Sequence, residues 1–113
     1  ITNSTFYGSA FYETSDERLK YFTSDVNVDF DKLKSIPKKY FMWKNREMNP
    51  TNIGTSAQKL QAVYPELVSE SEGYLRVDYA KLSVIALAAV DKLHEENEEL
   101  KERLKKIEEK LGL

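Results

Sequence analysis

A long stretch without helix breakers in the last third of the chain limits the possible folds more than any other feature. From Tyr79 to Leu111 the sequence contains neither proline nor glycine, and Asp78, directly before it, is a favourable N-cap residue. At about 1.5 Å per residue, a helix of this span would be on the order of 50 Å long. The rest of a chain of 113 residues is too small to cover such a rod. Part of the helix must therefore find another partner.

Apolar residues in this stretch recur in alternating steps of four and three, which is the pattern of a coiled coil. The spacing assigns heptad a positions to Val90, Asn97, Leu104 and Leu111 and d positions to Ala86, Leu93, Leu100 and Ile107. Between parallel, in-register neighbours, Glu96 at g would meet Lys101 at e, and Arg103 at g would meet Glu108 at e. Both pairs attract. We therefore expect an interface made by Val90, Leu93, Asn97, Leu100, Leu104, Ile107 and Leu111.

The width of the apolar strip decides between this coiled coil and a single amphipathic helix folded onto its own domain. Of residues 91–113, 14 are charged, and such a narrow strip favours a coiled-coil seam. Leu104 at a and Ile107 at d favour more than two strands, whereas Asn97 fixes the register without choosing between two and three. Residues 82–93 are apolar on more than one face. We expect them to pack both on their own domain and on sister helices.

The residues before the long helix predict short helices and strands, and hence an α+β fold with a small mixed globular part. A hairpin is expected over 66–78, with Leu67 and Val68 in its first arm and Gly73 in its turn. In chain order, the other expected elements are extended or loop structure over 1–14, a helix over 29–36, a strand over 39–44, a loop over 45–52, and a helix capped by Thr55 or Ser56 and stopped by Pro65.

Composition argues against several kinds of site. The 17 basic and 19 acidic residues nearly cancel to −2, which does not fit a nucleic-acid surface. No apolar run approaches membrane-spanning length. Without cysteine, and with His94 as the one histidine, the chain offers no ligand set for zinc, haem or an iron–sulfur cluster. We expect no metal and no cofactor, and we interpret His94 as a solvated helix residue. Because the chain starts at Ile1 within polar sequence, we expect a fragment of a longer protein.

Residues 14–20, TSDERLK, allow two interpretations. Thr14 and Glu17 have the spacing of a capping box, which would make Ser15 and Lys20 bystanders. Alternatively, a neutral, desolvated Lys20 takes the proton of Ser15 as the serine attacks a carbonyl. On a regular helix these two side chains would point about 140° apart. A dyad therefore needs a turn here or a lysine from a neighbouring subunit, and spacing alone favours the capping box.

Four stretches, in this order, resemble the peptidase S74 family, the intramolecular chaperone domains at the C-termini of phage tailspikes, tail fibres and neck appendages. They are SDERLK at 15–20, YFMWK at 40–44, IGTSAQKLQAVYPELV at 53–68 and YLRVDYAKL at 74–82. Two departures stand out. Thr55 follows Gly54 where many relatives have an aromatic residue, and the aromatic Tyr21 and Phe22 follow Lys20 where polar residues are expected. The second departure favours desolvation of the lysine.

The resemblance implies a homotrimer that aligns three chains, assists folding of an upstream β-rich fibre of the same polypeptide, and then cuts itself off. At the matching positions, Ser15 would be the nucleophile and Lys20 the general base of a serine peptidase that acts once, in cis or within the trimer. The expected cut is Ser15–Asp16. Thr14–Ser15 is the second choice, because attack on the preceding carbonyl forms a less strained ring.

The same resemblance implies a division of the chain and a place of action. Residues 1–14 would end the fibre, residues 15–90 would form the globular chaperone part, and residues 78–113 would form the overlapping long helix with its parallel trimeric coiled coil. The protein would be the precursor of a virion appendage made in the host cytoplasm, with the chaperone part absent from the mature virion. Two other interpretations remain: a non-catalytic trimerisation module that caps a fibre, and an unrelated coiled-coil adaptor.

Overall fold

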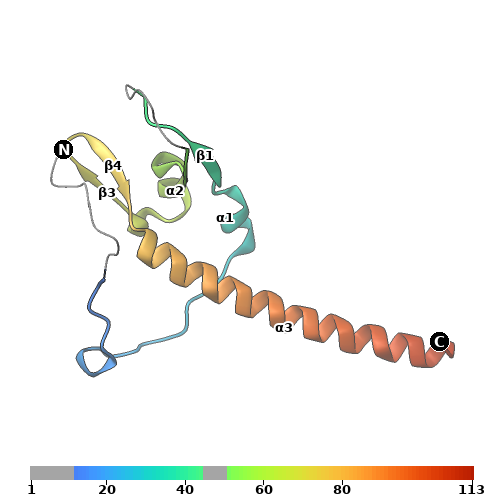
Figure 1. Ribbon diagram of the computed structural model, residues 1–113. Coiled ribbons are helices and arrows are strands. Elements are labelled where there is room, and N and C mark those ends of the chain that lie inside the picture. Colours follow the sequence, from blue (N-terminus) through green and yellow to red (C-terminus); the bar gives the residue numbers. More distant parts are fainter. Residues whose placement is uncertain (1–11, 45–50) are drawn as a thin grey trace.

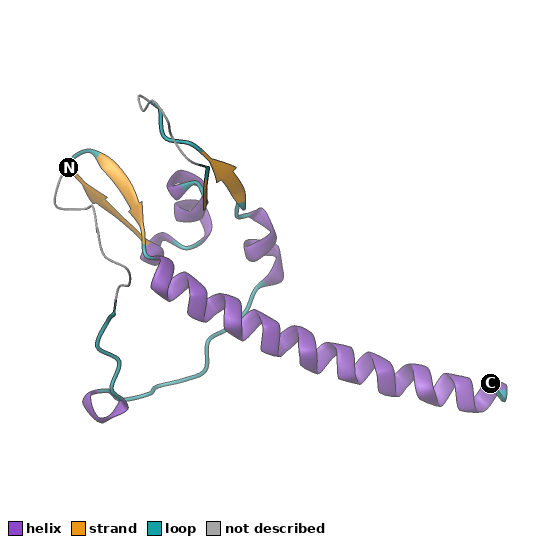
Figure 2. Cartoon of the chain, viewed as in Figure 1, coloured by secondary structure: helices purple, strands orange, loops and turns teal. Residues whose placement is uncertain are grey.

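The computed structural model describes residues 12–44 and 51–113, in which helices and short strands are mixed (Figure 1). Two separate antiparallel sheets of two strands each, β1–β2 and β3–β4, accompany the helices (Figure 2). This confirms the predicted α+β class. The elements in chain order are η2 (Glu17–Leu19), α1 (Phe30–Ser35), β1 (Lys39–Phe41), β2 (Asn52–Gly54), α2 (Ala57–Val63), η3 (Pro65–Leu67), β3 (Val68–Ser71), β4 (Tyr74–Val77) and α3 (Tyr79–Leu111).

The long helix α3 begins and ends where the sequence predicts. The carboxylate of Asp78 caps its start by accepting a hydrogen bond from the backbone N–H of Lys81 at 3.0 Å. Gly112 ends it with φ of 74°, a left-handed conformation that costs glycine little. The N–H of Leu113 then bonds to the carbonyl of Glu108 at 2.9 Å. Figure 1 shows α3 extending far beyond the other elements, and the molecule measures 65 × 40 × 29 Å.

The core is small and lies where the first half of α3 meets α2 and η3. Its buried side chains are Ile36, Leu60, Tyr64 and Leu67, and the partly buried Leu82 and Ile85 of α3 pack against them. This contact confirms that part of the 82–93 stretch packs on its own domain.

Two predicted helices are confirmed together with their boundaries. Helix α1 lies within the predicted 29–36 span and is capped by Asp29. The hydroxyl of Ser56 caps α2 by accepting a hydrogen bond from the N–H of Lys59 at 3.2 Å. Pro65 lacks a backbone N–H, and α2 ends before it while η3 begins at it.

The hairpin β3–β4 confirms the prediction with one shift. Val68 pairs with Val77, and Ser71 pairs with Tyr74. The two residues between the strands, Glu72 and Gly73, both have positive φ (53° and 83°), as a tight two-residue hairpin turn requires. The first arm begins at Val68 rather than at Leu67, because Leu67 completes η3 and is buried in the core.

The β1–β2 pair corrects the sequence-based assignment. The predicted strand over 39–44 is shorter, and β2 occupies residues that the sequence assigned to the end of a loop and the start of the next segment. Tyr40 of β1 pairs directly with Ile53 of β2. No periodic pattern in the local sequence predicts this pairing, because the two strands are too short to show one. Residues 45–50 of the predicted loop, and residues 1–11 of the predicted extended segment, lie outside the described residues.

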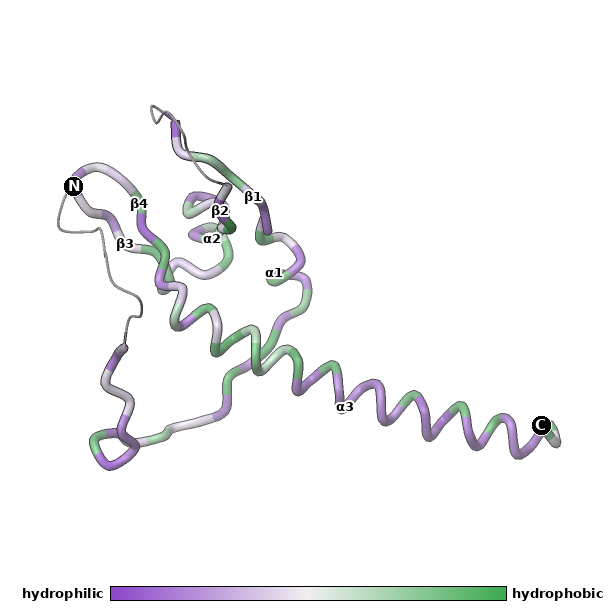
Figure 3. The backbone as a smooth tube through the Cα atoms, in the orientation of Figure 1, coloured by the Kyte–Doolittle hydropathy of each residue, from purple (hydrophilic) through white to green (hydrophobic). Residues whose placement is uncertain are grey.

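The second half of α3 carries an apolar stripe that its own chain leaves exposed. Every residue from 93 to 113 is exposed. Figure 3 shows hydrophobic and hydrophilic residues alternating along this half of the helix. The helix is therefore not folded back onto its own domain, which was the alternative to a coiled coil. The stripe comprises Val90, Leu93, Leu100, Leu104, Ile107 and Leu111, each more than half exposed.

Candidate functional site

Residues 15–20 form a tight turn, and this turn brings Ser15 and Lys20 together. The backbone N–H groups of Leu19 and Lys20 bond to the carbonyls of Asp16 and Glu17, which makes the single 3₁₀ turn η2. Lys20 then returns to an extended backbone with φ of −129° and ψ of 154°. Its Nζ donates a hydrogen bond to Oγ of Ser15, and the two atoms are 2.5 Å apart. This is the contact that a nucleophile and its base require, and a regular α-helix would have prevented it.

The cap of this turn differs from the predicted capping box. Asp16, rather than Thr14, is the N-cap residue, and its Oδ1 accepts from the backbone N–H of Arg18 at 2.9 Å. The Thr14–Glu17 box is wrong because the turn is too short for it. With only three residues in η2, the carboxylate at position 16 reaches the second backbone N–H.

A second contact pairs Asp16 with the side chain of Arg18. The guanidinium donates from Nε to Oδ1 at 3.1 Å and from Nη2 to Oδ2 at 2.7 Å. This side-chain bond, together with the backbone bond from Arg18, holds the pKa of the Asp16 carboxyl below its ordinary value. The carboxylate beside Ser15 is therefore engaged by Arg18, and Lys20 is left to bond to the serine.

The pair lies on an arm, which we define as residues 12–24, that has little cover from its own chain. Among the residues that the structure describes, the hydrogen bonds of this arm all lie within residues 15–20. Figure 1 shows the arm, in blue, on the opposite side of α3 from α2 and the strands. General-base action requires a neutral amine, which desolvation favours. In the single chain, water reaches both Ser15 and Lys20.

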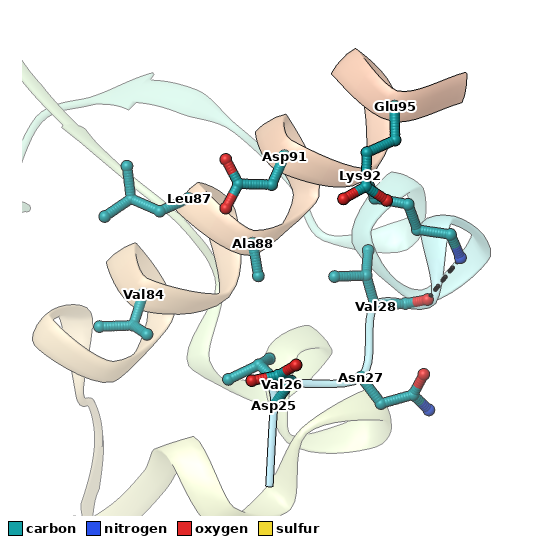
Figure 4. A pocket seen from close by; sticks show the side chains of 10 residues that line it. All are labelled: Asp25, Val26, Asn27, Val28, Val84, Leu87, Ala88, Asp91, Lys92 and Glu95. Carbon is teal, nitrogen blue, oxygen red and sulfur yellow. Dashed lines mark hydrogen bonds between the residues drawn. The ribbon is translucent and has the colours of Figure 1, made fainter. Parts of the chain in front are cut away.

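Residues 25–28 cross α3 and fix the position of the arm. The Nζ of Lys92 donates a hydrogen bond to the backbone carbonyl of Val28 at 3.1 Å (Figure 4) and lies 4.8 Å from the centre of the Phe30 ring. Val28 is buried. Sequence reasoning missed this crossing, because no local pattern connects positions that lie 64 residues apart.

A groove of about 620 Å³ lies between this crossing segment and α3. Its walls are residues 25–28 on one side and, on the other, Val84, Leu87, Ala88, Asp91, Lys92 and Glu95 (Figure 4). In the part of the chain that the structure describes, no three His, Cys, Asp or Glu side chains gather where a metal ion could be held. No helix among the described residues is both long and apolar enough to cross a membrane.

The predicted interface residues and the Ser15–Lys20 pair occupy different parts of the molecule. The stripe lies along the second half of α3, while the pair lies on the arm (Figure 1). His94, predicted as a solvated helix residue, is exposed on α3. Within one chain, the predicted catalytic residues thus lie apart from the predicted interface residues.

Comparison with known protein families identifies a match for about half of the chain. Residues 15–69 match the model of the family Peptidase_S74, described as chaperone of endosialidase. A comparison with curated proteins found no match. The matched segment begins at Ser15 and includes Lys20, so the hydrogen-bonded pair lies inside it. The family's name supports a chaperone role and suggests an autoprocessing serine peptidase. The match confirms, over residues 15–69, the peptidase S74 chaperone domain that the sequence motifs predicted.

Proposed function

We propose that this chain is an intramolecular chaperone that assembles as a parallel homotrimer, assists folding of the β-rich fibre preceding it in the same polypeptide, and releases itself by one self-cleavage. The observation that carries the proposal is the 2.5 Å hydrogen bond from Lys20 Nζ to Ser15 Oγ, inside the segment that matches the family. Within one chain, a serine and a lysine five positions apart meet only where the backbone makes a tight turn. Here the 3₁₀ turn η2 brings them together.

The chemistry follows from the roles that this contact gives to the two side chains. Neutral Lys20 accepts the proton of Ser15 as the Oγ attacks the carbonyl carbon of the scissile bond. The resulting intermediate collapses, the lysine returns the proton to the departing amine, and water then hydrolyses the ester. The cut is proposed at Ser15–Asp16 first and at Thr14–Ser15 second. Attack by the serine on its own carbonyl needs a strained four-membered ring, so the first site favours attack between chains.

The exposed stripe of α3 supports the proposed assembly. Its a and d residues form one continuous seam, and three such seams would bury one another in a parallel coiled coil. A trimeric coiled coil would hold three fibre ends at high effective concentration, which favours slow, non-local β pairing. Cleavage would then remove the chaperone and make unfolding of the fibre hard to reverse. The proposed setting is the precursor of a virion appendage in the host cytoplasm, and the mature virion would lack this part.

Measuring the mass of the intact protein tests the proposal. The chain is expressed with its upstream fibre and compared with Ser15→Ala, with Lys20→Ala, and with Ser24→Ala as a control on the same arm. We expect the parent and Ser24→Ala to release a fragment that starts at Asp16 or Ser15, and the other two to stay intact. An intact parent that is trimeric by mass would instead support a non-catalytic trimerisation module.

A further inference from the structure

Three strips run along α3: the g and c residues, the e and b residues, and the a and d residues of the predicted seam between them. In the heptad register fixed by Val90 at a, Leu82 is a g residue and Ile85 a c residue, and both pack on the core of their own chain. Leu87 at e and Val84 at b lie on the other side of the a/d strip, where they line the groove beneath residues 25–28. Leu87 is 66% exposed despite this groove. The globular part therefore lies on the g side of the predicted seam, whereas the crossing segment spans the outer face of α3, from Lys92 at c to Val84 and Leu87 on the e side.

A parallel coiled coil brings these two sides of neighbouring chains together. In such an assembly the g strip of one helix faces the e strip of the next. Leu82 of one chain would meet Leu87 of the next, an apolar counterpart to the charged pair of Glu96 and Lys101 further along. Because the globular part lies on the g side of its own helix, it would come beside the e side of the next helix. That is the side on which the next chain carries its arm.

The arm carries the kind of surface that such a neighbour would cover. Leu19, Tyr21 and Phe22 surround Lys20 in the sequence and are 76%, 99% and 78% exposed. Large apolar side chains gathered in this way mark an interaction site. Covering them would exclude water from the Ser15–Lys20 pair, which is the condition that the single chain does not meet.

We infer that the arm of one chain docks on the globular part of a second copy, and that this contact completes the Ser15–Lys20 site. The inference rests on the proposed parallel assembly and adds where its active site is completed. A second copy is favoured over the fibre because one partner would cover two surfaces at once, the arm and the exposed Leu87. The Lys92–Val28 hydrogen bond fixes one end of the crossing segment, and residues 25–28 share a groove with Leu87, which places the start of the arm on the side of Leu87.

Leu87 is then a positioning residue, and a substitution there tests the inference through cleavage. Leu87→Asp would hold the arm and the neighbouring globular part apart while the seam from Leu93 onward stays intact. We expect the trimer to persist by mass and cleavage to slow by roughly 100-fold, as for a reacting group misplaced by about 1 Å. Leu87→Met should restore the parent rate. Parent-like cleavage by a trimeric Leu87→Asp would overturn the inference.

Photo-crosslinking locates the contact directly. In an uncut Ser15→Ala chain, Tyr21→p-benzoylphenylalanine is prepared with and without ¹⁵N, and the two forms are mixed, unfolded, refolded together and irradiated. We expect crosslinked peptides that join a heavy and a light chain, with the acceptor between residues 36 and 82. Leu113→p-benzoylphenylalanine, a control off the seam whose side chain is 86% exposed, should give no such product with the globular part.

The same sample separates failure of the inference from failure of the proposed function. A trimeric mass with crosslinks only within one chain, only to upstream residues, or with none at all, would overturn the docking of the arm and leave the trimer standing. A monomeric mass would overturn both. Heavy–light products that map to the globular part would establish the contact.

Discussion

The two halves of α3 form one continuous helix but lie in different surroundings. In the first half, Leu82 and Ile85 pack on the core, and Ala89 is buried. In the second half no residue from 93 onward is buried, and in-chain support includes exposed pairs such as Lys101–Glu98 at 3.3 Å. Exposed pairs of this kind contribute only about 0.2–0.5 kcal/mol each. The first half is thus held by its own chain, while the stripe on the second half stays exposed in the single chain.

The largest expected effect comes from making the second half polar. Leu100→Asp combined with Leu104→Asp would place two carboxylates in the seam of each helix. Each buried leucine contributes about 1.5–3 kcal/mol, and a trimer would lose six of them. We expect a monomer by analytical ultracentrifugation at micromolar concentration, and no self-cleavage. The core of the first half should keep its near-ultraviolet circular dichroism.

A control places the same number of new carboxylates on the outer face of the helix, close to the substituted leucines. Lys105→Asp with Lys106→Asp introduces two aspartates at heptad b and c positions, away from the seam. This variant should stay trimeric and cut normally. Cleavage by the monomeric leucine variant would show that the arm needs no second chain, and would remove the link between assembly and chemistry.

The converse change weakens the core and leaves the seam alone. Leu60 has no exposed surface, and Leu60→Ala would leave a cavity among Ile36, Tyr64 and Leu67. Such substitutions cost about 2–5 kcal/mol. We expect a lower midpoint of urea unfolding for the globular part, followed by aromatic circular dichroism, with little change in the helical signal of the tail. Gln61→Ala, on the exposed face of α2, should leave the midpoint unchanged. A simultaneous loss of both signals would mean that the two halves unfold as one unit.

The difference between local and long-range contacts explains what the sequence could predict. The bounds of α3 follow from Asp78, Gly112 and the absence of breakers between them, the end of α2 follows from Pro65, and the β3–β4 hairpin follows from Gly73. These are local signals. The pairing of Tyr40 with Ile53, and the crossing of Val28 over Lys92, depend on residues far apart in the sequence, and no periodicity reports them. At the site, the sequence predicted that a Ser15–Lys20 dyad needs a turn or a lysine from a neighbouring subunit. The assignment of the cap to Thr14 was wrong, because a capping box presupposes a longer helix than η2.

A smaller effect is expected where β2 meets the start of α3. A Cβ at Gly54 would lie 2.8 Å from Cε1 of Phe41 and 3.0 Å from the hydroxyl oxygen of Tyr79. That hydroxyl also accepts a hydrogen bond from the N–H of Thr55 at 3.4 Å. Gly54→Ala should therefore destabilise the globular part by about 1–3 kcal/mol, as overpacking does. Urea unfolding measures the loss. In a Phe41→Leu background the loss should shrink, and an equal loss there would place the strain elsewhere.

The smallest effect concerns the hydroxyl of Tyr64, which lies in the core that the first half of α3 covers. This oxygen is buried and has no hydrogen-bond partner among the described residues. Tyr64→Phe removes it and keeps the ring beside Lys32, whose Nζ lies 5.4 Å from the ring centre. We expect stability that is unchanged or raised by up to about 1 kcal/mol near neutral pH, because an unpaired buried hydroxyl is costly.

The pH dependence of this variant sharpens the test. Burial, followed by the charges of Asp29 and Glu66, raises the pKa of Tyr64 above its ordinary value of 10.0. A group whose pKa is raised on folding contributes stability below its unfolded pKa and loses it as the pH rises towards the folded value. The parent should therefore weaken above pH 10 relative to Tyr64→Phe, as urea midpoints would show. If Tyr64→Phe is instead less stable at neutral pH, the hydroxyl has a partner beyond the residues that the structure describes, in this chain or in a neighbouring one. The core covered by the first half of α3 would then depend on that partner.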